Sequence, residues 1–238
     1  MAVTLQRRGF ADGAYEALKA LIFDQEIAPA ARMNIDLLAI ELGVSHTPIR
    51  EALARLEADG LVVKRPQGGY FAAPLVDEST FEQLYEVRLM LEPEAAARAA
   101  RHYEARHMRE LNQALAEMSH AGTGHHYRED KDFARQDSLF HTTIAVASGN
   151  LVLSDAVVRL RFHHQISRLY TRMGVDESAA IREHQGILDA MERRDQVASS
   201  EAMRRHIESS RGRLREFVRS ESTRPEGAVV TSQVVAQA

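Results

Sequence analysis

The sequence predicts a mainly α-helical protein of two domains. Apolar residues recur at helical spacing through most of the chain, and strand-like patterns are confined to one short stretch before residue 75. A length of 238 residues with 45% hydrophobic content suits two domains with their own cores. We expect a first domain at 1–75 with a small β-hairpin, an all-helical antiparallel bundle of about six helices at 76–220, and a disordered tail at 221–238.

An amphipathic helix over 10–27 opens the first domain, and two helices joined by a tight turn follow it. Gly43 stands where the first of these two helices must end, because glycine tolerates the left-handed backbone of a helix C-terminus. Ser45 is expected to cap the next helix, with Pro48 in its first turn. The buried stripe of that helix is predicted to be Ile49, Ala52, Leu53 and Leu56.

A β-hairpin is expected next, with strands at 61–63 and 70–72 and a turn at 64–69. The turn contains Lys64, Arg65 and two glycines, which can approach phosphates closely. Two helices with a tight turn followed by a hairpin are typical of a winged helix-turn-helix, which inserts the start of its second helix into the DNA major groove. The alternative is the same set of elements with no role in nucleic-acid binding.

Segment 10–75 resembles the winged helix-turn-helix of GntR-family bacterial regulators. The matching stretches are Gly-Val-Ser-His-Thr-Pro-Ile-Arg-Glu-Ala-Leu, Arg-Leu-Glu-Ala-Asp-Gly-Leu-Val and Pro-Gln-Gly-Gly-Tyr. The resemblance implies DNA contacts from the start of the second helix and from the wing. The predicted DNA-binding residues are Arg32, Ser45, His46, Thr47, Arg50, Lys64, Arg65, Gly68 and Gly69.

The sequence departs from the family pattern at three positions. His46 stands where relatives usually carry an arginine that reads guanine, and a neutral imidazole cannot make that bidentate contact. Asp36 stands where many relatives have a basic or longer acidic residue, and Ala30 replaces a usual glycine. The operator sequence of the family should therefore not be assumed for this chain.

Composition limits the partners and the compartment. The net charge of −4 argues against non-specific coating of nucleic acid, and residues 1–75 carry eight Lys or Arg against nine Asp or Glu. DNA binding therefore needs a local cluster of cations, which a homodimer would double, and it should weaken with added salt. The chain has no cysteine, no apolar signal segment and no apolar run of about 18 residues. We expect a cytoplasmic protein without a membrane span.

The second domain is predicted to be helical throughout. Asp77 or Ser79 is expected to cap its first helix. Glycine-containing or polar breaks near 122, 149, 174 and 195 separate the helices. The predicted helices run over 78–101, 104–120, 126–147, 151–173, 177–194 and 196–219.

A metal-ligand pattern lies in this helical domain. Asp137 and His141 are four residues apart and share a helix face, while His184 and His206 stand on the last two helices. The histidines are set among apolar residues, and burying such groups together needs a compensating cation. Three imidazoles and one carboxylate suit Zn²⁺ first, with Ni²⁺ or Mn²⁺ as alternatives. A lone helical histidine is more often a surface group, which is what we expect of His102, His107, His120, His125 and His126.

Segment 78–220 resembles the ligand-sensing domain of the FadR subgroup of the GntR family. Its metal-binding members use an Asp-x-x-x-His pair and two later histidines, a pattern that the four proposed ligands match. The resemblance also implies that Arg88 faces the cavity and pairs with an effector carboxylate. The alternative for Arg88 is a surface salt bridge to Glu92, four residues on. Some of four further residues are expected at the cavity: Arg161, His163, His164 and Arg168.

These features predict a DNA-binding regulator and not an enzyme. We expect a homodimeric repressor whose binding to double-stranded operator DNA responds to a small organic acid at the metal site. A metal-dependent hydrolase with an appended DNA-binding domain is the alternative, because such a site can activate water. A third hypothesis gives the metal a purely structural role in the bundle.

Overall fold

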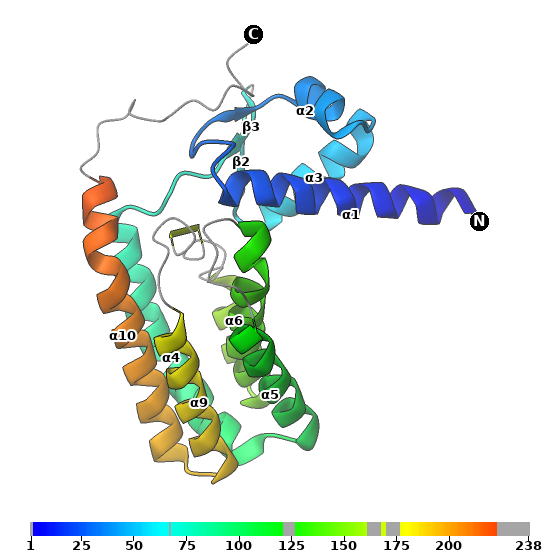
Figure 1. Cartoon of the computed structure of the whole chain (residues 1–238). Helices are drawn as coiled ribbons and strands as arrows, with labels where there is room; N and C mark the ends of the chain where they lie inside the picture. Colours follow the sequence, from blue (N-terminus) through cyan, green and yellow to red (C-terminus); the bar gives the residue numbers. More distant parts are fainter. Residues whose placement is uncertain (1, 67, 121–126, 161–167, 170–176, 223–238) are drawn as a thin grey trace. The chain divides into compact units, whose positions relative to one another are not determined.

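The computed structural model describes residues 2–66, 68–120, 127–160, 168–169 and 177–222. Its contacts divide the chain into two compact units, one up to Leu75 and the other from Val76. Within the described residues the chain is mainly helical with one small antiparallel sheet, which confirms the predicted fold class (Figure 1). The predicted tail at 221–238 lies almost entirely outside these residues.

Three helices build the described part of the first unit: α1 (Ala2–Phe23), α2 (Ile35–Leu42) and α3 (His46–Ala58). Helix α1 begins earlier than predicted and ends earlier. Its end is set by Gln25, which has a φ of 57°, and by the Ile27 N–H, which donates to the Leu21 carbonyl. Helix α2 is capped by Asn34, whose side-chain oxygen accepts the N–H groups of Asp36 and Leu37.

The turn between α2 and α3 is closed by backbone groups. Gly43 has a φ of 64°, in the left-handed region, and the Val44 N–H donates to the Ala39 carbonyl at 3.1 Å. Ser45 occupies the N-cap position of α3, but its hydroxyl makes no capping hydrogen bond. The predicted side-chain cap is therefore absent, and α3 is held by its packing.

That packing is complete on the inner face of α3. Ile49, Ala52, Leu53 and Leu56 are all fully buried, as the helical spacing predicted, and they pack against α1, whose Leu18 and Ile22 are also fully buried. Each of the leucine and isoleucine side chains contributes about 1.5–3 kcal/mol on burial. The opposite face of α3 is thereby fixed toward solvent.

The sheet has three antiparallel strands in the order β1-β3-β2: β1 (Arg32–Met33), β2 (Val62–Arg65) and β3 (Gly69–Ala72). The hairpin is tighter than predicted, because Arg65 already pairs with Gly69. Strand β1 was not predicted, since two residues are too few to show an alternating pattern.

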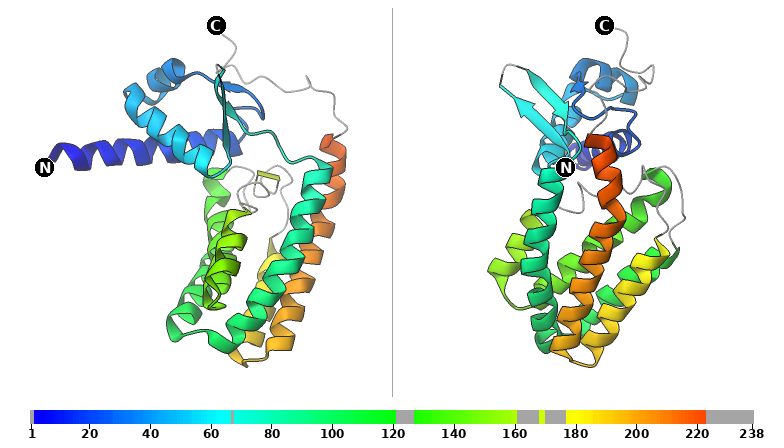
Figure 2. Two further views of the ribbon diagram at one scale, coloured as in Figure 1. Left: turned by 180° about the vertical axis from the view of Figure 1, so that it is seen from behind. Right: turned by 90° about the vertical axis from the view of Figure 1, so that its left-hand side faces the viewer.

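Six helices of the second unit lie within the described residues: α4 (Glu78–His102), α5 (Ala105–His120), α6 (Tyr127–Ala147), α7 (Leu151–Arg159), α9 (Ser178–Glu192) and α10 (Gln196–Ser222). Figures 1 and 2 show α10 running alongside α4, with α9 next to both and α5 beside α6. Glu82 of α4 pairs with Arg211 and Arg215 of α10, whereas Glu78 pairs with Arg219, so the two helices are antiparallel.

Two expectations for this unit were wrong, and the structure shows which residue caps its first helix. The helix predicted over 151–173 is shorter, because α7 ends at Arg159 and most of the remainder lies outside the described residues. His107 is buried, and its Nδ1 accepts the Glu104 N–H at 3.2 Å, so it is not a surface residue. Asp77 caps α4 by accepting the Thr80 N–H at 2.7 Å, a bond that lowers the pKa of its carboxyl. No helix in the described ranges is long and apolar enough to cross a membrane.

Candidate metal centre and DNA-binding surface

Three histidines from three helices meet inside the second unit. His141 of α6, His184 of α9 and His206 of α10 place one ring nitrogen each within 4.8 Å of the others. The Nε2 atoms of His141 and His184 are 3.3 Å apart. All three rings are buried, which the surrounding apolar residues predicted.

Asp137 joins this cluster from α6, one turn before His141. Its Oδ1 lies 3.4 Å from Nε2 of His184 and 3.9 Å from Nε2 of His141. Its side chain is 22% exposed, whereas the three imidazoles are at most 5% exposed. The fold therefore brings together the four residues that the sequence singled out, with the carboxylate on the side nearest solvent.

Two carboxylates contact the Nδ1 atoms of two of the three rings. Nδ1 of His141 lies 2.6 Å from Oε2 of Glu92, and Nδ1 of His206 lies 2.9 Å from Oε2 of Glu183. Because an ionised carboxylate only accepts hydrogen bonds, each Nδ1 carries the proton. In a neutral ring the lone pair is then on Nε2. This arrangement orients metal-binding histidines in many proteins.

Neither carboxylate was predicted as part of the site. Glu92 was considered only as a surface partner of Arg88. Glu183 accepts a hydrogen bond from Nδ1 of His206 and also pairs with both terminal nitrogens of Arg213, at 2.7 and 2.9 Å. These contacts join residues 23 to 49 positions apart, so no local spacing in the sequence could indicate them.

The pair formed by Arg88 and Glu92 is buried, not on the surface. Arg88 is 1% exposed, and its Nε lies 2.5 Å from Oε1 of Glu92. Burial alone would raise the pKa of the Glu92 carboxyl, but Arg88 and His141 hold it well below its ordinary value. Burial would lower the pKa of Arg88, but Glu92 raises it. Both groups are therefore charged at neutral pH. Glu92 contacts the histidine cluster through His141, and Arg88 contacts Glu92.

His206 is suited to be a neutral ligand. Burial lowers its pKa to about 4, although the hydrogen bond to Glu183 works in the opposite direction. Burial would raise the pKa of Glu183, but the bonds from His206 and Arg213 lower it to about 2. At pH 7 Glu183 is therefore ionised and the His206 ring is uncharged. A histidine must be uncharged to bind a metal through a ring nitrogen.

The donor set fits a divalent metal ion. In a tetrahedral site with zinc–nitrogen distances of 2.0–2.1 Å, two ligand nitrogens lie about 3.4 Å apart. The His141–His184 separation of 3.3 Å and the Asp137–His184 separation of 3.4 Å match that value. Of the further residues expected at the cavity, Arg168 is buried in this unit, and Arg161, His163 and His164 lie outside the described residues.

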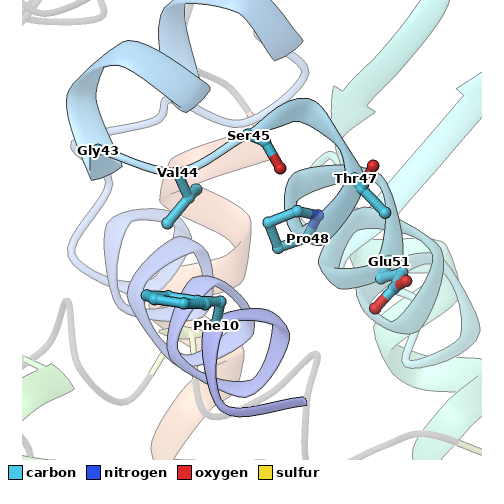
Figure 3. Close-up of a pocket in the computed structure, with 7 residues that line it drawn as sticks. All are labelled: Phe10, Gly43, Val44, Ser45, Thr47, Pro48 and Glu51. Atoms are coloured by element: carbon cyan, nitrogen blue, oxygen red, sulfur yellow. The ribbon is translucent and has the colours of Figure 1, made fainter. Parts of the chain in front are cut away.

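The outer face of α3 carries the predicted DNA-reading groups of the first unit. Ser45, His46, Thr47 and Arg50 are all exposed. Figure 3 shows Phe10 of α1 facing Val44 and Pro48 across a pocket of about 250 Å³ beneath the start of α3. Arg55, further along α3, pairs instead with Asp12 at 2.5 Å and stacks on Tyr15, so it holds α3 to α1.

The wing presents two cations beside aromatic rings. The guanidinium of Arg65 lies 4.2 Å from the ring centre of Phe71, and the Lys64 ammonium lies 5.5 Å from that of Tyr70. Gly69 has a φ of 82°, and a Cβ on Gly68 would lie 3.3 Å from the Phe71 ring, so both glycines shape the hairpin tip. The predicted contact Arg32 is exposed on β1.

A three-helix unit with a hairpin wing, an exposed α3 start and a separate helical unit defines a winged helix-turn-helix transcriptional regulator. The chain belongs to the GntR family: residues 10–71 match the bacterial regulatory proteins of the gntR family, and residues 83–209 match the FCD domain. The FCD match replaces the narrower FadR assignment with a broader one.

Full-length relatives agree with this assignment. The chain is 27% identical over 194 residues to "Uncharacterized HTH-type transcriptional regulator YdhC" of Bacillus subtilis, covering 81% of this chain and 85% of the relative. It is 28% identical over 180 residues to "Probable D-xylose utilization operon transcriptional repressor" of Paenarthrobacter nicotinovorans, covering 76% of each. The structure of E. coli McbR/YncC has a TM-score of 0.66 at 20% identity, over 87% of this chain and 98% of that one, which shows the same fold. Both sequence relatives carry the names of transcriptional regulators, and the hydrolase alternative is not supported.

Proposed function

We propose that operator binding by this regulator is controlled by a small carboxylate metabolite that binds at a divalent metal ion. The metal ligands would be Asp137, His141, His184 and His206, with Zn²⁺ as the first choice and Ni²⁺ or Mn²⁺ as alternatives. The observation that carries the proposal is the buried three-histidine cluster, with two of its rings oriented through Nδ1 by carboxylates. A cation would use the buried ring nitrogens as ligands and would offset the charge of the Asp137 carboxylate beside them.

The charges around the cluster favour an anionic effector. With the histidines neutral, Arg88 and Arg213 stand against three carboxylates, those of Glu92, Asp137 and Glu183. This group of five has one negative charge, so a divalent ion leaves one positive charge in a largely buried site. A monocarboxylate would neutralise it, and the metal when bound supplies a Lewis-acid position for a carboxylate oxygen.

The effector is proposed to enter from the Asp137 side, because that side chain is the most exposed of the four. Arg88 would be its second anchor. The guanidinium is already engaged by Glu92, so the incoming carboxylate must share or replace that contact. Arg88→Lys should therefore weaken acid binding, since a lysine keeps the charge but not the forked geometry.

The remaining parts of the proposal concern assembly and DNA. We infer a cytoplasmic homodimer of the FadR subgroup that acts as a repressor, because helix-turn-helix dimers read paired half-sites and the first unit is not basic enough to bind DNA alone. Repression is also the role in the printed name of the D-xylose relative. The proposed DNA contacts are Arg32, Ser45, His46, Thr47, Arg50, Lys64, Arg65, Gly68 and Gly69.

The test combines metal content with a ligand panel. The wild type should bind one Zn²⁺ per chain, measured by elemental analysis after dialysis, and His184→Ala should lose it. His102→Ala is the matched control, because His102 is exposed on α4. Zinc-loaded protein is then heated with lactate-like acids, sugar acids, dicarboxylates and citrate-like acids. At 100 times its Kd, a bound acid stabilises the folded protein by about 2.7 kcal/mol.

The outcomes separate the hypotheses. A panel member that stabilises the wild type and leaves His184→Ala unchanged supports the sensor. An unchanged response across the whole panel contradicts it. Loss of the helical circular-dichroism signal on EDTA treatment favours a structural metal, whereas an intact fold with a lost acid response favours the sensor.

A further inference from the structure

Two of the three departures from the family pattern lie side by side in the fold. Asp36 is in the first turn of α2, and His46 is the first residue of α3. Nε2 of His46 lies 3.2 Å from Oδ1 of Asp36. The side chains are 55% and 77% exposed, at the end of α3 that enters the major groove. We propose that Asp36 and His46 act together as a base reader that selects cytosine; this inference rests on operator binding through α3.

The contact with Asp36 favours one ring nitrogen of His46 as the acceptor. A carboxylate oxygen repels a lone pair and attracts a proton, so its position 3.2 Å from Nε2 favours the ring form that carries the proton on Nε2. In the neutral ring Nδ1 then carries the lone pair. Without Asp36 the ring could present either nitrogen as a donor or as an acceptor.

The pair therefore presents acceptors only. The second oxygen of Asp36 and Nδ1 of His46 both need a hydrogen-bond donor. In the major groove cytosine shows an amino donor alone, adenine shows a donor next to an acceptor, and guanine and thymine show acceptors. Cytosine is thus the base whose edge matches the pair. An arginine at the same position would select guanine, which is the opposite preference.

A role in reading DNA also explains why a carboxylate stands at position 36, although phosphates repel it. Asp36 would be repelled by phosphates, which dominate the surface of DNA, and gains only at a base edge that donates a hydrogen bond. As an exposed ion pair the contact contributes little to folding stability. The pair can therefore be changed with little effect on the fold.

The test is selection from a random double-stranded DNA library at pH 8, using the full-length chain. The wild type should prefer cytosine over other bases about fivefold or more at one position of each half-site. Asp36→Ala and His46→Ala should lose that preference while keeping the rest of the selected sequence. His46→Arg should change the preferred base to guanine.

The control is Glu41→Ala, which removes an exposed acid from the same helix. Glu41 is five residues from Asp36, about 140° around α2, so the preference for cytosine should stay. Equal thermal stability of the variants shows that they fold. A wild type that prefers guanine, or an Asp36→Ala variant that selects like the wild type, overturns the inference. A wild type that selects no sequence overturns operator recognition as well.

Discussion

The pH dependence of folding in the metal-free protein tests the buried histidine cluster. His206 has a pKa of about 4 in the folded chain and about 6.5 when unfolded. As the pH falls through 6.5, His206 therefore binds a proton in the unfolded chain but stays unprotonated in the folded chain. The contribution of the buried neutral His206 to the free energy of unfolding is fully present above pH 6.5 and is lost as the pH falls toward 4. At pH 5 the loss relative to pH 8 is about 2 kcal/mol.

The assay is urea unfolding in EDTA, followed by circular dichroism at pH 8 and pH 5. The helical unit is identified by the transition that moves to higher urea when zinc is added. His206→Gln should lose about 2 kcal/mol less than the wild type between the two pH values, because glutamine does not titrate. Glu183 stays ionised at pH 5 in the folded chain, so it does not obscure the comparison.

The matched control is His102→Gln, which changes an exposed histidine of the same unit. It should show the full pH sensitivity of the wild type. Equal losses in the wild type and His206→Gln would refute the reasoning, because they would mean that His206 is not held neutral by burial.

Three further predictions follow from the contacts. Glu183→Gln should weaken zinc binding about 10–100-fold in a chelator competition, because His206 loses its orienting carboxylate. The control Glu201→Gln, on the exposed face of α10, should leave zinc binding unchanged. Equal zinc affinities of Glu183→Gln and the wild type would refute this role of Glu183. Leu53→Ala should destabilise the first unit by about 2–5 kcal/mol in urea unfolding and leave zinc affinity unchanged, and an unchanged midpoint would contradict the packing of α3. Arg50→Ala should abolish sequence-specific binding in anisotropy measurements while its thermal stability stays that of the wild type, and retained specificity would remove Arg50 from the DNA contacts.

The helix-turn-helix was predictable because its signals are local. Gly43 and the apolar spacing of α3 lie within 14 residues, and each behaves in the fold as its chemistry requires. Ser45 was only partly predictable: the position of the cap is a backbone property, but the hydroxyl bond depends on a rotamer. Strand β1 exists through its pairing with β3, which its own two residues do not indicate.

The candidate metal site shows the same division. Asp137 and His141 share a helix face by spacing, and apolar neighbours indicated that His184 and His206 point inward. The orienting groups could not be predicted, because Glu92 reaches His141 from another helix. Arg88 illustrates both cases: its partner four residues on was foreseen, but burial of the pair depends on how α4 packs against its neighbours.

The most direct test of metal-dependent control is the affinity for a selected operator, measured by fluorescence anisotropy with and without the stabilising acid. The zinc-loaded wild type should change its affinity at least tenfold when the acid is added, because an effector must bind one arrangement of the protein better than the other. His184→Ala should bind the operator as tightly as the acid-free wild type and show no response. An unchanged affinity in the wild type, or an equal response in His184→Ala, would contradict control through this site.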